Sequence, residues 1–352
     1  KIASKCLWKA LEDFNEKHFK PWQLAMQRGG CEKNLHSLRT VMQAQPTRDV
    51  YTIDADNAFN LAERRIGLSE LMEHEQLNGL LPFLRNMYLE DSEGWYFGLP
   101  QGVAAIKSRA GYHQGDILAT FMYILTIQPL LQRLHDHLCS IFNPDGSDEE
   151  STSLRMFFVD DGNLVAPHLV MIHMISFLQT HGPTFGFHIK KNKGAYLRGM
   201  CDGNPEEALR RRDALVSQLG LSEDVIRIHP DDVQPDAQEA ALAAYGVKVL
   251  GSYVGTDQYI QRNLLEYVSE LNDIGRKLTA YPDLQGRLLL FRLCFATKPY
   301  YIYRTIPPHL SHAVYGPFEE IRFWQTSWCS RSASIVRRSP IVKRNSAFLK
   351  EA

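Results

Sequence analysis

Hydrophobic residues recur along most of this chain at the three- and four-residue spacing of amphipathic helices. This spacing predicts helices over residues 2–19, 31–43, 61–72, 75–88, 114–138, 168–180 and 206–219, and a largely helical chain from residue 258 onward. Pro129 lies inside the longest of these, from Gln114 to Leu138, and we expect it to kink that helix.

Shorter apolar runs, rich in β-branched and aromatic residues, predict strands between these helices. They cover residues 50–53, 95–97, 103–106, 156–159, 163–165 and 247–250, with a further strand pair between Gly186 and Leu197. Because strands and helices alternate irregularly, the pattern predicts an α+β fold.

Two segments differ from the rest in composition. Residues 199–245 combine a helix with a polar, acidic stretch, and we expect an insertion between core elements, either a binding surface or an idle loop region. The tail from Arg331 to Arg344 carries five basic residues and no acidic ones. It is either a phosphate-contacting arm or a disordered end.

Composition narrows the class of protein only moderately. The length of 352 residues predicts two or three structural units, and the formal net charge of −1 counts mildly against a nucleic-acid enzyme unless charge is segregated locally. The six cysteines show no CxxC spacing, which argues against a disulfide scaffold and favours a reducing, intracellular compartment. Nucleus, cytoplasm and mitochondrion stay open. No apolar run approaches the roughly 18 residues of a membrane span, so we expect no membrane partner.

The stretch with the clearest chemistry is Met156 to Val165, MFFVDDGNLV, in which Asp160 and Asp161 separate two apolar runs. The pattern predicts a tight β-hairpin with its acidic pair at the turn. Taken alone, Asp-Asp-Gly is most simply a polar turn. However, two adjacent carboxylates are costly to keep ionised beside an apolar sheet, and a hard cation such as Mg²⁺ removes that cost.

A second acidic element follows the strand at residues 50–53 and begins with Asp54. A strand that ends in one aspartate and a hairpin that carries two more can build a two-metal site. Such a site needs about three carboxylates around two cations roughly 3.5–4 Å apart. Between these elements, Gly111 to Asp116 opens the long helix, and a glycine-rich entry of this kind suits a phosphate-bearing ligand.

In their order and spacing, these motifs resemble the reverse transcriptases of non-LTR retrotransposons. The resemblance spans residues of about 20 to 310. Five motifs carry it: Asp54-xxx-Ala58-Phe59-Asn60, Gly111-xx-Gln114-Gly115-Asp116, Phe158-Val159-Asp160-Asp161, Gly186-Phe187-His188-Ile189 with Lys193, and Val249-Leu250-Gly251-Ser252. The resemblance implies a polymerase right-hand architecture. Its parts would be partial fingers at 1–48, a palm at 49–256 that includes the remaining fingers elements and the insertion, a helical thumb at 257–316, and a C-terminal extension at 317–352.

The same resemblance assigns roles to individual residues. Metal ligands would be Asp54, Asp160 and Asp161, which are also the catalytic carboxylates, together with the Ala55 carbonyl. Nucleotide-binding residues would be Asn57, Phe59, Gln114, Gly115 and Lys193, and the primer grip would contain Leu250 and Gly251. Phe59 would exclude a 2′-hydroxyl, and Lys193 would lie near the triphosphate as a proton donor. Plainer readings stay open: Phe59 as core packing, Gln114 as a helix cap, and Lys193 as a surface lysine.

The chain also departs from the family pattern. Ile117 and Leu118 follow Asp116 where the family usually has Pro and Leu. The chain begins without Met inside a predicted helix, so we expect a fragment that lacks part of the nucleotide clamp of the fingers.

Two functions are therefore carried forward. The first is an RNA-directed DNA polymerase that uses two Mg²⁺ ions, with Mn²⁺ as an alternative, and has an RNA template, a DNA primer and dNTP as partners. The second is a domesticated, non-catalytic reverse-transcriptase-like subunit with a structural or RNA-binding role in a large ribonucleoprotein complex.

Overall fold

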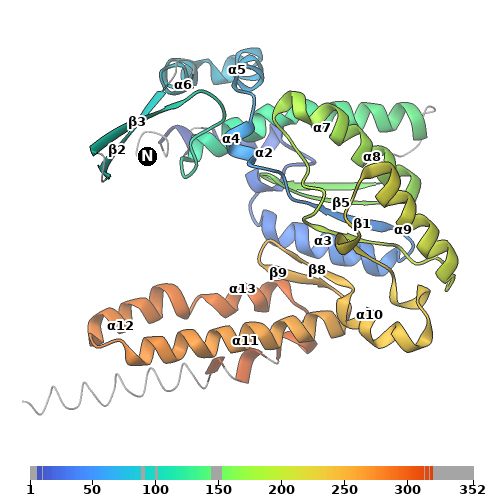
Figure 1. Ribbon diagram of the computed structural model, residues 1–352. Helices are drawn as coiled ribbons and strands as arrows, with labels where there is room; N and C mark the ends of the chain where they lie inside the picture. Colours follow the sequence, from blue (N-terminus) through green and yellow to red (C-terminus); the bar gives the residue numbers. More distant parts are fainter. Residues whose placement is uncertain are drawn as a thin grey trace, which may run out of the picture. The chain divides into compact units, whose positions relative to one another are not determined.

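The fold is a mixture of helices and strands in two compact units, residues 1–250 and 251–352. The structure is a computed structural model (Figure 1), and it describes residues 6–9, 11–88, 92–99, 102–143, 153–312, 314–316 and 318–319. The expected palm–thumb boundary lay after residue 256, and the two units divide after Leu250.

A five-stranded sheet organises the first unit, with the strand order β4-β5-β1-β6-β7. Its strands are β1 (Asp49–Ile53), β4 (Leu154–Phe158), β5 (Asp161–Ala166), β6 (Ala195–Leu197) and β7 (Ile226–Arg227). All pairs are antiparallel except β6–β7. Every residue of β1 is buried, which explains why its sequence from Val50 to Ile53 is a continuous run of strand formers without alternation.

Two long apolar helices supply most of the core of this unit. They are α7 (Ile117–Phe142) and α8 (His168–His181), whose inward residues include Phe121, Leu125 and Met174. By length and composition α7 could cross a membrane, which corrects the expectation that no segment reaches that size. Within the structure, 67% of its most apolar window is buried, as in the core helix of a folded domain.

The remaining elements before α7 are a 15-residue helix, α3, and several shorter helices and strands. They are α2 (Glu12–His18), η1 (Leu24–Met26), α3 (Gly30–Ala44), α4 (Ala58–Leu61), α5 (Arg64–Glu73), η2 (Glu75–Leu80), α6 (Leu81–Tyr88), β2 (Ser92–Leu99) and β3 (Gly102–Ser108). The strands β2 and β3 form a separate antiparallel hairpin (Figure 1).

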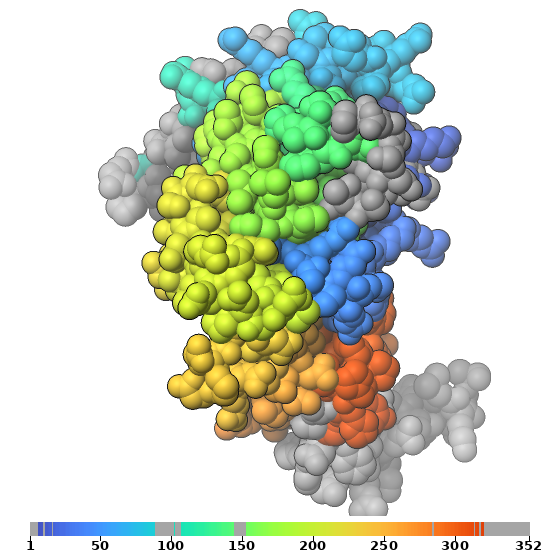
Figure 2. All heavy atoms as spheres, turned by 90° about the vertical axis from the view of Figure 1, so that its right-hand side faces the viewer, coloured from blue at the N-terminus to red at the C-terminus, as the bar shows by residue number. Residues whose placement is uncertain are grey.

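The segment 199–245 packs closely onto the sheet. It contains α9 (Pro205–Leu219), η5 (Glu223–Val225), β7, η6 (Pro230–Asp232), η7 (Pro235–Ala237) and α10 (Gln238–Ala244). Leu215 and Leu219 join the core of the unit, and the buried Asp232 carboxylate accepts hydrogen bonds from the backbone N–H of Cys201 and Gly203. In Figure 2 the yellow-green surface of this segment adjoins the blue residues before β1, where the Met200 N–H donates to the Pro46 carbonyl.

The second unit is helical after one strand. Its elements are β9 (Ser252–Gly255), α11 (Asp257–Ala280), α12 (Leu284–Leu290), a π-helix (Phe291–Phe295) and α13 (Lys298–Thr305). They share a core that contains Leu264, Leu271, Phe295 and Ile302. This confirms the helical pattern predicted from residue 258 onward.

Most element predictions are confirmed, and three need correction. A strand pair was predicted between Gly186 and Leu197, but the described strand there is β6 alone. Residues 186–194 form turns and a single bridge at Ile189 instead. The helix predicted over 2–19 is interrupted before α2, and the helix predicted from Gln114 begins only at Ile117. Pro129 lies inside α7, as predicted. The tail at 331–344 and most of the loop at 143–150 lie outside the described residues.

Candidate active site

The register of three strands brings the predicted acidic residues to one edge of the sheet. Ile53 pairs with Gly162 and Phe158 pairs with Asp161, so β1 ends beside the turn of the β4–β5 hairpin. Asp54 follows β1, while Asp160 lies in the turn and Asp161 begins β5. The structure therefore places the three carboxylates predicted from sequence next to one another.

The hairpin turn is held in a strained conformation. Val159 has φ of 62°, which is unusual for any residue other than glycine and costly for a β-branched one. The buried Gln23 side chain clamps this residue: its Nε2 donates to the Val159 carbonyl at 2.8 Å, and its Oε1 accepts from the Val159 N–H at 3.1 Å. Strain of this kind persists only where the surroundings over-determine it. Gln23 therefore positions the turn that carries Asp160.

The three carboxylates interact electrostatically. Burial raises the pKa of Asp161 to about 6, and the charges of Asp160 and Asp54 add to that rise, although the side chain keeps exposed surface. Burial also raises the pKa of Asp160, with Asp54 contributing and with the backbone of Asp160 and Lys190 opposing. Like charges held together in this way favour either a proton or a bound cation.

Two buried tyrosines near this edge have hydroxyl groups that lack hydrogen-bond partners among the described residues. They are Tyr51 on β1 and Tyr123 on α7, and both side chains are fully buried. Burial raises the pKa of Tyr123, and Asp160 and Asp161 add to the rise. For Tyr51, burial and then Asp54 act in the same direction. Unsatisfied buried hydroxyls next to carboxylates are the surroundings expected where a ligand or water completes a site.

Lys190 is a residue of this site that sequence reasoning missed. Its Nζ lies 3.5 Å from Asp54 Oδ1 and 3.3 Å from Asp56 Oδ1. Slight burial lowers the pKa of Lys190, but the hydrogen bonds and charges of Asp56 and Asp54 outweigh it and the pKa is raised. The predicted basic residue, Lys193, is exposed three positions further on, and its backbone N–H donates to the Lys190 carbonyl. The bridge at Ile189, which is not evident in the sequence, brings the backbone of Lys190 beside Asp54.

That bridge also orients the peptide groups of Ala55. Asp56 N–H donates to the His188 carbonyl and Lys190 N–H donates to the Asp54 carbonyl, with Ala55 opposite Ile189 between them. Where the residues on either side make the hydrogen bonds of an antiparallel bridge, the residue between them directs its own N–H and C=O away from the partner segment. The Ala55 carbonyl therefore faces the β5 side, consistent with its predicted role as a metal ligand.

Phe59 lies on α4, and this helix begins directly after Asn57. Asn57 is exposed and has φ of 44°. The ring of Phe59 is half-buried and stacks on Tyr123, with centroids 5.1 Å apart and an interplanar angle of 19°. The ring of Phe59 therefore packs against the core, and its role in nucleotide binding stays a prediction.

The loop that contains Gly111 is attached to α4. Tyr112 N–H donates to the Phe59 carbonyl at 2.6 Å, and a Cβ on Gly111 would lie 2.2 Å from that same oxygen. The buried Arg64 guanidinium donates to the carbonyls of Gly111 and Ala110. Arg64 is therefore a positioning residue for this loop.

Further along this loop, Gln114 and Gly115 are exposed, and Gly115 has φ of 84°. The N-cap of α7 is Asp116, whose Oδ1 accepts from Leu118 N–H at 3.0 Å. Gln114 is therefore not the cap of this helix, and its side chain stays available to a ligand.

A small cavity of about 250 Å³ connects the acids with the predicted primer grip. Asp54, Asp161, Lys248 and Leu250 are among the residues that line it. Leu250 and Gly251 separate β8 (Gly246–Val249) from β9, with φ of 47° and 81°, the positive values that a tight two-residue hairpin turn requires. Leu250, which was predicted from a motif far from Asp54 in sequence, therefore lies in the same cavity as Asp54.

The oxygen atoms at this edge are of the kind that bind a divalent cation, but they do not form a complete set of ligands around one. Carboxylate and carbonyl oxygens are the ligands that Mg²⁺ prefers, and it is often held by one or two carboxylates together with substrate phosphates. Among the described residues, no group of three or more His, Cys, Asp or Glu side chains is assembled tightly enough to hold a metal. In addition, Asp54 forms an ion pair with Lys190.

Comparisons with known proteins add little to this geometry. No family model and no curated protein matches the chain. Two solved telomerase structures are similar to it. The apo enzyme from Candida tropicalis, truncated from its C-terminal domain, has a TM-score of 0.38 and 8% identity, and the match covers 53% of this chain and 39% of that one. Telomerase from Candida albicans, in complex with a TWJ fragment of telomeric RNA, has a TM-score of 0.33 and 11% identity over 53% of this chain and 32% of that one. Each match covers less than half of the telomerase chain.

Proposed function

We propose that this chain is the polymerase region of an RNA-directed DNA polymerase of retrotransposon type. The observation that carries the proposal is the convergence of Asp54, Asp160 and Asp161 at one edge of the sheet, with Leu250 in the same cavity as Asp54 and Asp161. These residues come from three separate parts of the sequence. The proposed parts are partial fingers, a palm built on the five-stranded sheet and a helical thumb.

The proposed reaction is attack of a primer 3′-hydroxyl on the α-phosphate of a dNTP, with pyrophosphate as the leaving group. Two Mg²⁺ ions, when bound, would lower the pKa of the attacking hydroxyl and stabilise the leaving oxygens. Asp54, Asp160, Asp161 and the Ala55 carbonyl would hold them. Catalysis would consist mainly of positioning and electrostatic stabilisation.

The remaining residues would select and orient the substrates. Phe59, backed by Tyr123, would fill the space that a ribose 2′-hydroxyl needs. Asn57, Gln114 and Gly115 would contact the nucleotide, and Lys193 would lie near the triphosphate. Leu250 and Gly251 would support the primer end.

The alternative is a non-catalytic subunit of a ribonucleoprotein complex. The ion pairs of Lys190 with Asp54 and Asp56 favour it, because the ammonium group of a lysine in this position offsets carboxylate charge without a metal ion.

Primer extension on an RNA template separates the two functions. Wild-type protein with Mg²⁺ and dNTP is expected to extend the primer, and the Asp160→Ala/Asp161→Ala variant is expected to lose at least 10³-fold, a loss of about 4 kcal/mol in transition-state stabilisation. EDTA should abolish extension. Asp213→Ala, on the exposed surface of α9, is the matched control and should retain full activity. A folded wild-type protein that extends no primer would leave the non-catalytic function, and extension that survives the double substitution would refute the site.

A further inference from the structure

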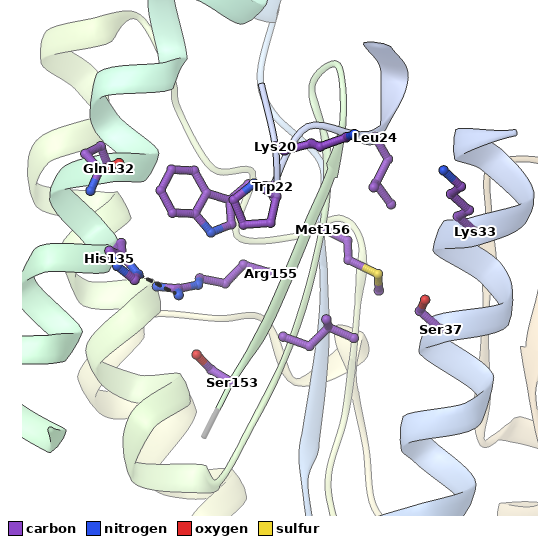
Figure 3. Close-up of a pocket in the computed structure, with 12 residues that line it drawn as sticks. Lys20, Trp22, Leu24, Lys33, Ser37, Gln132, His135, Ser153, Arg155 and Met156 are labelled. Atoms are coloured by element: carbon purple, nitrogen blue, oxygen red, sulfur yellow. Dashed lines mark hydrogen bonds between the residues drawn. The ribbon is translucent and has the colours of Figure 1, made fainter. Parts of the chain in front are cut away.

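A second cavity, of about 930 Å³, lies at the outer edge of the sheet beside β4. β4 is the first strand in the sheet order, so its outer edge faces no other strand of that sheet. The cavity is lined from four directions, by the turn before η1, by α3, by the second half of α7, and by β4 itself (Figure 3). Its volume is near the upper end of the roughly 300–1,000 Å³ range of small-molecule sites.

The cavity walls carry an excess of positive charge. Lys20, Lys33 and Arg155 line it together with His135, and none of the described lining residues is acidic. The whole chain has a formal net charge of −1, so this is a local concentration of one sign. Such a surface raises the local concentration of anions.

Among the contacts of Arg155 in the described part of the chain, two hold its guanidinium in the wall. Its guanidinium lies 5.8 Å from the centre of the Trp22 ring, and its Nη2 lies 3.1 Å from Nδ1 of His135. Since the guanidinium can only donate, Nδ1 accepts and the proton of a neutral His135 resides on Nε2. Arg155 is thus held in place before any ligand arrives.

The two lysines approach the cavity from its other side. Both side chains are exposed, and Figure 3 shows the amino ends of Lys20 and Lys33 directed toward the space above Leu24. They belong to different elements, since Lys20 precedes η1 and Lys33 lies in the first turns of α3. The positive charges are therefore distributed along the cavity instead of meeting at one point.

The largest apolar residues of the wall are buried. Trp22, Leu24 and Met156 are 7%, 8% and 3% exposed, so they belong to the core and form no open anchor pockets, whereas the exposed Pro21 and the half-buried Leu154 supply the other apolar surface of the wall. Protein partners depend on desolvated aromatic and aliphatic anchors, whereas nucleic-acid interfaces are polar and strongly positive. Distributed cations along a groove are the arrangement that follows a sugar–phosphate backbone.

We propose that this cavity binds the backbone of a single-stranded nucleic acid. Lys20 and Lys33 contact phosphates on one side and Arg155 on the other, with the hydroxyls of Ser37 and Ser153 as further donors. The site is separate from the Asp54 edge and does not depend on catalysis. The Asp160→Ala/Asp161→Ala variant should therefore bind RNA as the wild type does at this site.

The test is fluorescence anisotropy with a labelled 20-nucleotide RNA, titrated at several salt concentrations. Each phosphate contact contributes about 0.7 to the slope of log K against log salt for a single strand. Lys20→Gln/Lys33→Gln is expected to lower that slope by about 1.4 and to weaken binding at least fivefold. The matched control, Arg210→Gln/Arg212→Gln on α9, removes the same charge from a surface outside the cavity and should change neither value to that extent. Both lysines are exposed, and unchanged circular dichroism will show that the variant is folded.

Competition decides the class of ligand. Unlabelled RNA should displace the probe from the wild type, whereas inorganic phosphate at millimolar concentration and polyglutamate of equal charge should not. Displacement by phosphate alone would indicate a single-anion site, and displacement by polyglutamate an acidic peptide site. Either result overturns the proposal, as does a salt slope equal to that of the control variant.

Discussion

The clamp between Gln23 and the hairpin turn makes a sharp prediction for stability. Replacing Gln23 by Ala removes two hydrogen bonds to the backbone of Val159, from a side chain that is 0% exposed. Each bond contributes about 1 kcal/mol net, and each part-buried backbone group that loses its partner costs about 1–3 kcal/mol. After partial relaxation of the turn, we expect a loss of about 2–4 kcal/mol in the free energy of unfolding of the first unit.

This loss is measurable by urea denaturation and by calorimetry. For a unit of this size, 1 kcal/mol shifts Tm by about 2–4 °C, so Gln23→Ala should lower Tm by roughly 5–15 °C. Gln218→Ala, at an exposed position of α9, is the matched control and should stay within about 0.5 kcal/mol of the wild type. A Gln23→Ala variant equally close to the wild type would refute the clamp.

The strain itself can be separated from the hydrogen bonds by a double-mutant cycle. Glycine adopts a φ of 62° without steric cost, so Val159→Gly should recover about 1 kcal/mol in the Gln23→Ala background. If the effects of the two substitutions on the free energy of unfolding add within about 0.5 kcal/mol, Gln23 does not hold Val159 in a strained conformation.

Four further predictions concern the acidic edge. Asp161, with a pKa of about 6, binds a proton in the folded state that the unfolded chain, with a carboxyl pKa near 4, has already released. Stability without metal should therefore fall as the pH rises from about 4 to 6, and Asp161→Asn should remove this fall in a series of Tm measurements; a persistent fall would assign it to another group. Tyr123→Phe keeps the stacked ring and deletes an unsatisfied hydroxyl, so it should raise stability by about 1 kcal/mol in the absence of ligand; destabilisation would show that the hydroxyl has a partner. Phe59→Val should admit ribonucleotides at least tenfold more readily in primer extension, and unchanged sugar selectivity would remove Phe59 from the site. Lys190→Met should free Asp54 and lower the Mg²⁺ concentration at half-maximal activity, and a higher requirement would mean that Lys190 supports the metal site.

Local patterns predicted the elements of this protein well where one physical cause dominated. The spacing of apolar residues located α3, α8 and α9, because each of these helices has one face that packs on the core. The same reasoning failed between Gly186 and Leu197, where Phe187 lies outside any strand but is buried in the core. It also described residues 199–245 as an insertion, although Leu215 and Leu219 of that segment belong to the core.

The candidate site divides in the same way. The order of the motifs and their resemblance to a known family named Asp54, Asp160 and Asp161, since Asp-Asp-Gly taken alone is most simply a polar turn, and the strand register places these residues at one edge of the sheet. Motifs also named Phe59 and Leu250. They did not indicate Lys190 or Gln23 as parts of the site, since an isolated lysine or glutamine carries no local signal of its partner.

Periodicity and side-chain chemistry act over a few neighbouring residues, so they were enough to predict most of the elements and the acidic residues at the ends of the strands. How these parts meet depends on the folded chain: strand register places Asp161 beside the end of β1, the bridge at Ile189 brings Lys190 beside Asp54, and Gln23 contacts Val159 from 136 residues away. The same holds for the basic cavity at β4, whose charges are far apart in the chain. Long-range contacts depend on packing and hydrogen-bond satisfaction throughout the fold, and these leave no periodic trace in the sequence.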